Sequence, residues 1–314
     1  MKIIFNTENL NIDEQLKIKE RIQEYFNNTK LELNSLQKVV ISSNFFEDVI
    51  KTQKELGLEI DVASNNENAE AVAKVITSRK SKNIKSIIIA NEHLISKISS
   101  SRLEVRLNGF HVIHHELAHV HDNYIKSKIF TDEERRGTGV SHLKHYLRVN
   151  ADAIWSEYIA ERLSAASATF DHAEMLINLF KLQGSNLNRS FELEQANYFR
   201  HKDTNIAFDK VSETMYYFLK TNLMIIGILD GMAKEDVKKY LKSEILKSIG
   251  ESYFIEIFHL IKNSLSDMYS KYPNWKSIGE IDPLGSAIKD AWLWLGFKLV
   301  ELDESYYRVD IRTN

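Results

Sequence analysis

The chain has 314 residues, of which 43% are hydrophobic and 27% charged, so it can bury at least one large core. Its 41 Lys and Arg against 44 Asp and Glu leave a formal net charge of -3, which provides no general basic field for nucleic acid or an anionic membrane. Cysteine is absent, which excludes disulfides, thiolate metal sites and cysteine nucleophiles. Any metal ion must therefore be bound by His, Asp or Glu.

The N-terminal residues MKIIFNTENL lack the basic and then apolar run of a signal peptide. The longest apolar run, Leu223 to Leu229, is too short to cross a bilayer. These features predict a cytoplasmic protein without a membrane partner, and without a nucleic-acid partner given its charge.

Short β-branched runs mark the N-terminal third and predict the strands of a small sheet. They are Ile3 to Phe5, Val39 to Ser42, Leu58 to Val62, Ala71 to Ile76 and Ser86 to Ile89. Between the second and third, Phe45 to Leu56 has helical spacing and predicts an amphipathic crossover helix.

From about Asn91 onward, apolar residues recur three and four apart, and the sequence holds only two prolines and 11 glycines to interrupt long helices. Helical patterns cover Ile154 to Leu163, Ala173 to Leu182, Val211 to Leu229, Lys234 to Ile249 and Tyr253 to Tyr272. Gly250 and Pro273 follow the last two as stop signals. A final helix should begin with Asp282 as cap and Pro283 at the first helical position, with a stripe that extends to Leu299.

These patterns predict a helix-rich α+β fold, with a small twisted N-terminal sheet followed by a helical C-terminal region. We expect an α/β unit over residues 1–165 and a helical region over 166–314 that packs against it.

One segment carries the pattern of a metal site. Residues 110–122 read FHVIHHELAHVHD and contain an HExxH motif at His115, Glu116 and His119. Residues four apart share a helix face, so the two imidazoles can converge on one tetrahedral zinc ion. Glu116 lies roughly 100° around the axis, where it can reach a water at the metal as general base without being a ligand. The motif therefore predicts hydrolysis by a metal-activated water.

A catalytic zinc of this kind takes a third protein ligand. The metzincin continuation is excluded because Asp122 and Ile125 occupy the positions of its Gly and His. A second helix supplies Glu157, 38 positions after His119, but Glu161 lies one turn further on the same face. Spacing alone leaves both carboxylates open as the ligand.

HExxH with a downstream Glu that is followed three residues later by Ala resembles the gluzincin metallopeptidases and, more loosely, the ImmA/IrrE type of intracellular metallopeptidase. The resemblance covers about residues 36–165. It implies zincin-like active-site helices beside a small twisted sheet, with His115, His119 and Glu157 as zinc ligands and Glu116 as general base. It also implies that Ala160 is the small residue that lets the two helices approach. Glu161 stands where those proteins usually have Asn, and no helix-turn-helix partner segment is present.

Other residues near the motif leave alternatives open. Asp122 lies on the ligand face, either to accept a hydrogen bond from a ligand imidazole or as an acidic residue in solvent. His111 lies on that face one turn earlier, as an additional contact or as a structural residue. A donor for the developing oxyanion is needed, and we favour His145 from the set His142, His145, Tyr146, Arg148 and Tyr158.

The sequence thus predicts a zinc-dependent metallopeptidase that acts on a peptide or protein substrate. The alternatives are a catalytically silent protein that keeps a zincin scaffold for binding or regulation, and a helical protein in which HExxH arose by chance. The sequence pattern does not specify the oligomeric state.

Overall fold

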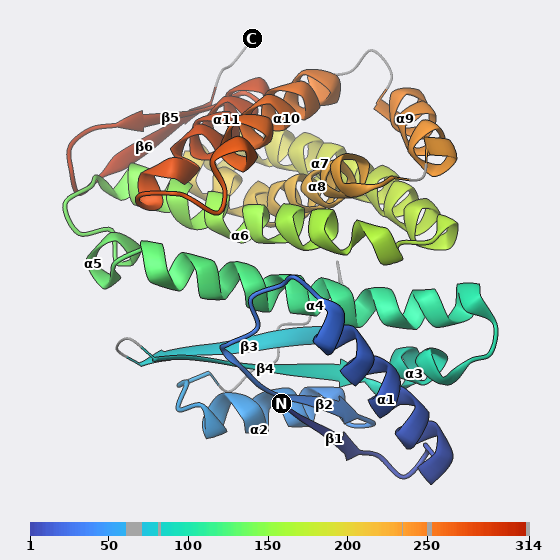
Figure 1. The fold of residues 1–314 in the computed structure, drawn as a ribbon. Helices are drawn as coiled ribbons and strands as arrows, with labels where there is room; N and C mark the ends of the chain where they lie inside the picture. Colours follow the sequence, from blue (N-terminus) through green and yellow to red (C-terminus); the bar gives the residue numbers. More distant parts are fainter. Residues whose placement is uncertain (61–70, 81–82, 234, 250–252, 312–314) are drawn as a thin grey trace. The chain divides into compact units, whose positions relative to one another are not determined.

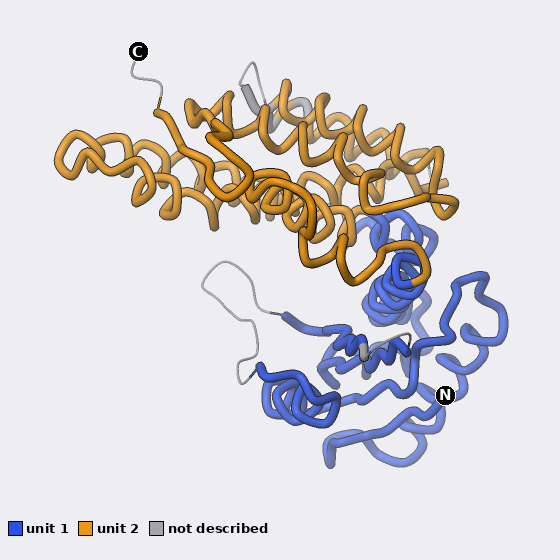
Figure 2. The backbone as a smooth tube through the Cα atoms, turned by 90° about the vertical axis from the view of Figure 1, so that its left-hand side faces the viewer, with its two compact units in different colours: residues 1–127, 159–172 blue, residues 128–158, 173–314 orange. Residues whose placement is uncertain are grey.

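The computed structural model describes residues 1–60, 71–80, 83–233, 235–249 and 253–311 (Figure 1). The chain divides into two compact units, coloured separately in Figure 2. Unit 1 comprises residues 1–127 and 159–172, and unit 2 comprises residues 128–158 and 173–314.

Unit 1 is built on a four-stranded sheet of order β1-β2-β4-β3. Its strands are β1 (Lys2–Asn6), β2 (Leu36–Ser42), β3 (Ala73–Lys80) and β4 (Asn83–Asn91). Strands β1, β2 and β4 are parallel, and β3 runs antiparallel to β4. Side chains alternate between the faces of a strand, so Val39 and Ile41 lie in one core while Val40 lies in another.

Helices cover both faces of this sheet. They are α1 (Ile12–Asn28), α2 (Phe45–Glu55), α3 (Glu92–Ile95), the 3-10 helix η1 (Ser96–Ser99) and α4 (Leu103–Ile129). Buried residues of α1, α3, η1 and α4 share one core with β2 and β4. On the other face, Phe45 and Val49 of α2 pack with Val40, Ile87 and Ile89. Because parallel strands are buried on both sides, β2 and β4 are nearly continuous apolar runs.

Unit 2 is mainly helical. The elements after α4 are α5 (Asp132–Arg135), α6 (His142–Ser164), η2 (Ala165–Ser167), α7 (Phe170–His201), α8 (Thr204–Gly231), α9 (Glu235–Ile249), α10 (Tyr253–Lys271), η3 (Ile278–Ile281), α11 (Asp282–Trp294), β5 (Phe297–Glu301) and β6 (Tyr307–Ile311). Strands β5 and β6 form an antiparallel pair. Phe208 of α8 and Phe297 of β5 meet Trp292 of α11 at ring-centroid distances of 4.4 and 5.5 Å, which ties the hairpin to the helices.

The predicted α+β, helix-rich fold with its small N-terminal sheet is confirmed. Four of the five predicted strands correspond to β1, β2, β3 and β4, and the crossover helix corresponds to α2. The strand predicted at Leu58 to Val62 is wrong over residues 58–60, while 61 and 62 lie outside the described residues. Gly57 has φ of +67°, and the amide of Leu58 donates to the Gln53 carbonyl at 2.9 Å, so this backbone closes the C-terminus of α2.

Three details of the last predicted helix are corrected. Asp282 is not a cap, because its carboxylate accepts hydrogen bonds from Arg148 at 2.6 and 2.9 Å. Gly296, with φ of +90°, follows the end of α11, so Leu299 belongs to β5 instead of the helix stripe. Pro283 is the second residue of α11, one position later than predicted, because the helix already begins at Asp282. Gly250, the predicted stop after α9, lies outside the described residues.

The compact units also divide the chain differently from the predicted boundary at residue 165. The first part of α6 belongs to unit 2, where Trp155 packs on Trp275 with ring centroids 4.8 Å apart. Over the described ranges, every helix is either too short or too polar to cross a membrane.

Candidate metal centre

The orientation of α4 sets the direction of its histidines. Ile113, Leu117 and Val120 are fully buried in the core against the sheet, at the three- and four-residue spacing of one helix face. At about 100° per residue, His111, His115 and His119 fall on the opposite side of the helix. The hydrophobic face therefore turns a row of imidazoles away from the sheet.

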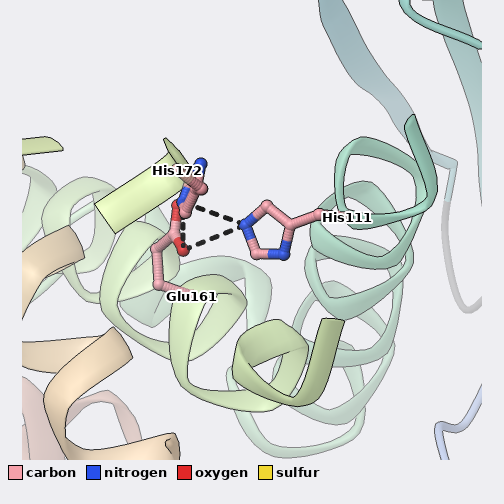
Figure 3. A group of neighbouring side chains, drawn as sticks. All are labelled: His111, Glu161 and His172. Carbon is pink, nitrogen blue, oxygen red and sulfur yellow. Dashed lines mark hydrogen bonds and ion pairs between the residues drawn. The ribbon is translucent and has the colours of Figure 1, made fainter. Parts of the chain in front are cut away.

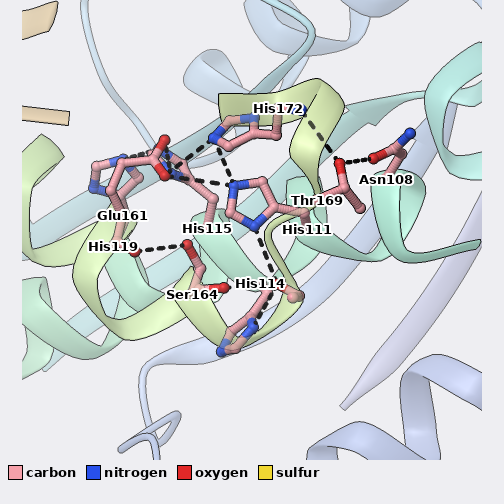
Figure 4. A network of polar contacts seen from close by, with 10 residues as sticks. Asn108, His111, His114, His115, His119, Glu161, Ser164, Thr169 and His172 are labelled. Atoms are coloured by element: carbon pink, nitrogen blue, oxygen red, sulfur yellow. Dashed lines mark hydrogen bonds and ion pairs between the residues drawn. The ribbon is translucent and has the colours of Figure 1, made fainter. Parts of the chain in front are cut away.

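His115 and His119 converge as the HExxH motif predicts. Their Nε2 atoms are 3.0 Å apart, and both side chains are half-buried (Figure 4). Two ring nitrogens this close share either a proton or a metal ion. Tetrahedral zinc with Zn–N bonds of about 2.0–2.1 Å separates two nitrogen ligands by roughly 3.3 Å, so the pair fits such an ion.

Glu161 of α6 orients the first of these histidines. Its Oε1 lies 3.3 Å from Nδ1 of His115, and only 1% of the Glu161 side chain is exposed. The negative charge beside Nδ1 favours a proton on that nitrogen, which leaves the lone pair on Nε2, facing His119. Burial on its own would raise the pKa of Glu161, but the charges of His172 and His115 bring this pKa well below its usual value.

Glu157, the predicted third ligand, is four residues before Glu161 on the same continuous helix and so lies one turn away on the same face. Glu157 belongs to unit 2 and the two histidines to unit 1, and together they would offer two imidazole nitrogens and one carboxylate oxygen, a donor set that zinc accepts. Since Glu161 faces Nδ1 of His115 and not the paired Nε2 atoms, this arrangement favours Glu157 as the ligand.

Lys220 of α8 was not found by sequence reasoning. Its Nζ lies 2.8 Å from Oε1 of Glu157. Burial would lower the pKa of Lys220, but the Glu157 carboxylate raises it above the ordinary range. A carboxylate has two oxygens, so Lys220 can hold one while the other remains a ligand.

Two further motif residues are buried. Glu116, the predicted general base, is 7% exposed. Asp122 is fully buried and pairs with Lys126 at 2.7 Å, so it is not an acidic residue in solvent.

His145, the favoured oxyanion donor, belongs to unit 2, whereas His115 and His119 belong to unit 1. It precedes Glu157 by 12 positions on α6, which is roughly 18 Å along the helix axis. Other members of the predicted donor set already have partners: Arg148 binds Asp282, and the Tyr158 hydroxyl lies 3.0 Å from Asp230. The role of His145 as oxyanion donor stays a prediction.

A second cluster surrounds the other oxygen of Glu161 (Figure 3). His111 Nε2 and His172 Nε2 lie 3.4 and 3.2 Å from Glu161 Oε2, and the two nitrogens are 3.0 Å apart. Burial lowers the pKa of His111 to about 4, with a further contribution from His172. His172, at the start of α7, follows no spacing rule relative to the motif, and no sequence pattern marks it as a site residue.

Comparison with protein-family models, curated proteins and solved structures found no match for this chain. The functional argument therefore depends on the geometry of these side chains.

Proposed function

We propose that this chain is a zinc-dependent hydrolase of the metallopeptidase class, which cleaves peptide bonds in a peptide or protein substrate. One observation carries the proposal: within HExxH, the Nε2 atoms of His115 and His119 approach to 3.0 Å on an uninterrupted helix. The carboxylate of Glu161 at Nδ1 of His115 supports it, because carboxylate partners of this kind are common behind zinc-bound histidines.

The proposed ligands are His115, His119 and Glu157. Two nitrogens and one carboxylate oxygen are a donor set that zinc accepts in hydrolases, and three protein ligands leave one position open. Lys220 offsets part of the negative charge of Glu157 and restricts its rotation.

Zinc held by these residues would supply Lewis acidity, which brings a water toward deprotonation near neutral pH. Glu116 would take the proton from the attacking water and return it to the leaving amine as the peptide bond breaks. Glu161 would keep the proton of His115 on Nδ1, so that Nε2 remains a ligand throughout.

The role of Glu116 is tested by Glu116→Gln, assayed with a peptide library and by elemental analysis of the purified chain. We expect hydrolysis to fall by about 10²-fold or more while the zinc content stays unchanged. Glu104→Gln, an exposed change on the same helix, is the matched control and should retain both properties. Loss of zinc from Glu116→Gln would contradict the assignment of this residue as base.

The third ligand is tested by Glu157→Ala. This variant should lose hydrolysis together with the zinc that supports it. Zinc bound by the wild type without hydrolysis of any peptide would assign the scaffold to binding or regulation instead. Absence of zinc after refolding with metal would indicate that the HExxH motif arose by chance.

A further inference from the structure

The second cluster, His111, Glu161 and His172, is not used by the proposed reaction. All three residues belong to unit 1, and they come from α4, α6 and α7. We propose that His111 Nε2, His172 Nε2 and Glu161 Oε2 bind a second divalent transition-metal ion, of which zinc best fits the donors. This inference does not depend on the hydrolase proposal, because it concerns metal binding alone.

The three donor atoms form a nearly regular triangle. Its edges are 3.0 Å between the two Nε2 atoms, 3.2 Å from His172 to Glu161 and 3.4 Å from His111 to Glu161. Ligands of tetrahedral zinc are separated by roughly 3.3 Å when the bonds are about 2.0–2.1 Å long. The triangle thus matches one face of a zinc coordination tetrahedron.

Hydrogen bonds behind the triangle decide which nitrogen of His111 carries a proton. Ser167 Oγ donates its single hydrogen to the Ser164 carbonyl at 2.7 Å. It must therefore accept from Nδ1 of His111 at 3.1 Å and from Nδ1 of His114 at 2.9 Å. A neutral His111 protonated at Nδ1 has only a lone pair at Nε2.

That lone pair faces a carboxylate oxygen. The edge from His111 Nε2 to Glu161 Oε2 joins two hydrogen-bond acceptors, and a proton on His172 Nε2 cannot lie between them. A cation inside the triangle would convert all three close approaches into metal–ligand bonds. Ser167 would then act as the hydrogen-bond partner that fixes the tautomer and ring orientation of a ligand.

Burial adds to this argument. The Glu161 side chain is 1% exposed and that of His111 is 4% exposed, and a buried carboxylate requires a compensating positive charge. A divalent cation supplies that charge at the point where residues of α4, α6 and α7 meet. The ion would therefore join these three helices and hold Glu161 in place behind His115.

The experiment is a zinc titration of the full chain, expressed without a histidine tag and stripped with a chelator. Bound zinc is measured by elemental analysis after desalting. We expect about two zinc ions per chain in the wild type and about one in His172→Asn. His114→Asn is the matched control, because His114 also bonds Ser167 but lies outside the triangle, and it should still bind about two.

A second variant keeps the proposal testable if His172→Asn does not fold. The double change His119→Asn with Glu157→Gln removes the first centre, and this protein should still bind about one zinc with the second triangle intact. One zinc in the wild type and no zinc in the double variant would overturn the proposal. So would equal zinc content in the wild type and His172→Asn. Failure of the hydrolase proposal would be read separately, from the loss or retention of peptide cleavage.

Discussion

Two clusters of the same chemical groups lie along the face of α4 that points away from the sheet. The first, at His115 and His119, is half-buried, whereas in the second His111 and Glu161 are buried and His172 is half-buried. Catalytic zinc keeps a coordination position open to water and substrate, while structural zinc is enclosed by protein. The proposals above therefore give the first cluster a reactive role and the second, with its buried carboxylate, a structural role.

Glu161 is the residue that both clusters share. One carboxylate oxygen faces Nδ1 of His115 and the other faces the Nε2 atoms of His111 and His172. Any change at Glu161 should therefore affect both clusters, and changes elsewhere should affect one of them more than the other.

The largest effect is expected from Glu161→Gln. Neutralising this buried carboxylate removes the charge that faces three imidazoles, so the free energy of unfolding should fall by about 3 kcal/mol. The second cluster should lose its metal, and zinc affinity at the first should fall by about 10- to 100-fold, as for other hydrogen-bond partners of metal ligands. Urea unfolding and zinc titration measure the two effects.

Glu157→Gln is the comparison for that variant. It should abolish zinc binding at the first cluster and leave the second, because Glu157 takes no part in the triangle. Equal zinc loss from both clusters in Glu157→Gln would show that they are not separate sites.

The first cluster could be predicted from the sequence because its geometry is local. Residues four apart on one helix share a face whatever the tertiary structure, so His115 and His119 follow from HExxH alone. The choice between Glu157 and Glu161 could not be made this way, since it depends on which ring nitrogen each carboxylate faces. His172 and Lys220 are brought in by tertiary packing and have no spacing signal in the sequence.

The fold shows the same division between local and tertiary information. The strands of the sheet were predicted because β-branched runs are buried on both sides. Helix α1 was not predicted, since its apolar residues Ile18 and Ile22 lie among many charged ones. Strand β5 was mistaken for helix because Leu299 continues the apolar spacing of α11 across Gly296.

A smaller effect is expected from pH at His114, which shares Ser167 with His111 of the second cluster, in metal-free protein. Burial, assisted by His111 and His115, lowers the pKa of His114 to about 3. An unfolded histidine gains its proton near pH 6.5, so the unfolded state binds more protons between pH 6.5 and about 3, and stability falls as pH falls through this window.

For His114 alone, the expected loss between pH 7 and pH 5 is about 2 kcal/mol, from about 1.4 kcal/mol per pKa unit. The unfolding free energy of the wild type and of His114→Asn should be measured at both pH values. The variant should lose about 2 kcal/mol less than the wild type over this interval. Identical losses would show that the neutral ring of His114 is not required by the Ser167 hydrogen bond.

The smallest effect is expected at Gly109, two residues before His111. A Cβ there would lie 2.8 Å from the Leu94 carbonyl and 3.0 Å from the Ile98 amide, so α4 would have to move away from α3 and η1. Gly109→Ala should therefore lower the free energy of unfolding by about 1 kcal/mol, because overpacking exceeds the usual gain from alanine in a helix.

The core contacts of Ile113 and Leu117 hold the rest of α4, so His111 should move more than His119. Zinc titration should show a greater loss of affinity at the second cluster than at the first, while Glu104→Ala on the exposed face should change neither. An increase in stability with both affinities unchanged would show that the helix tolerates a methyl group here and that its N-terminal half does not position His111.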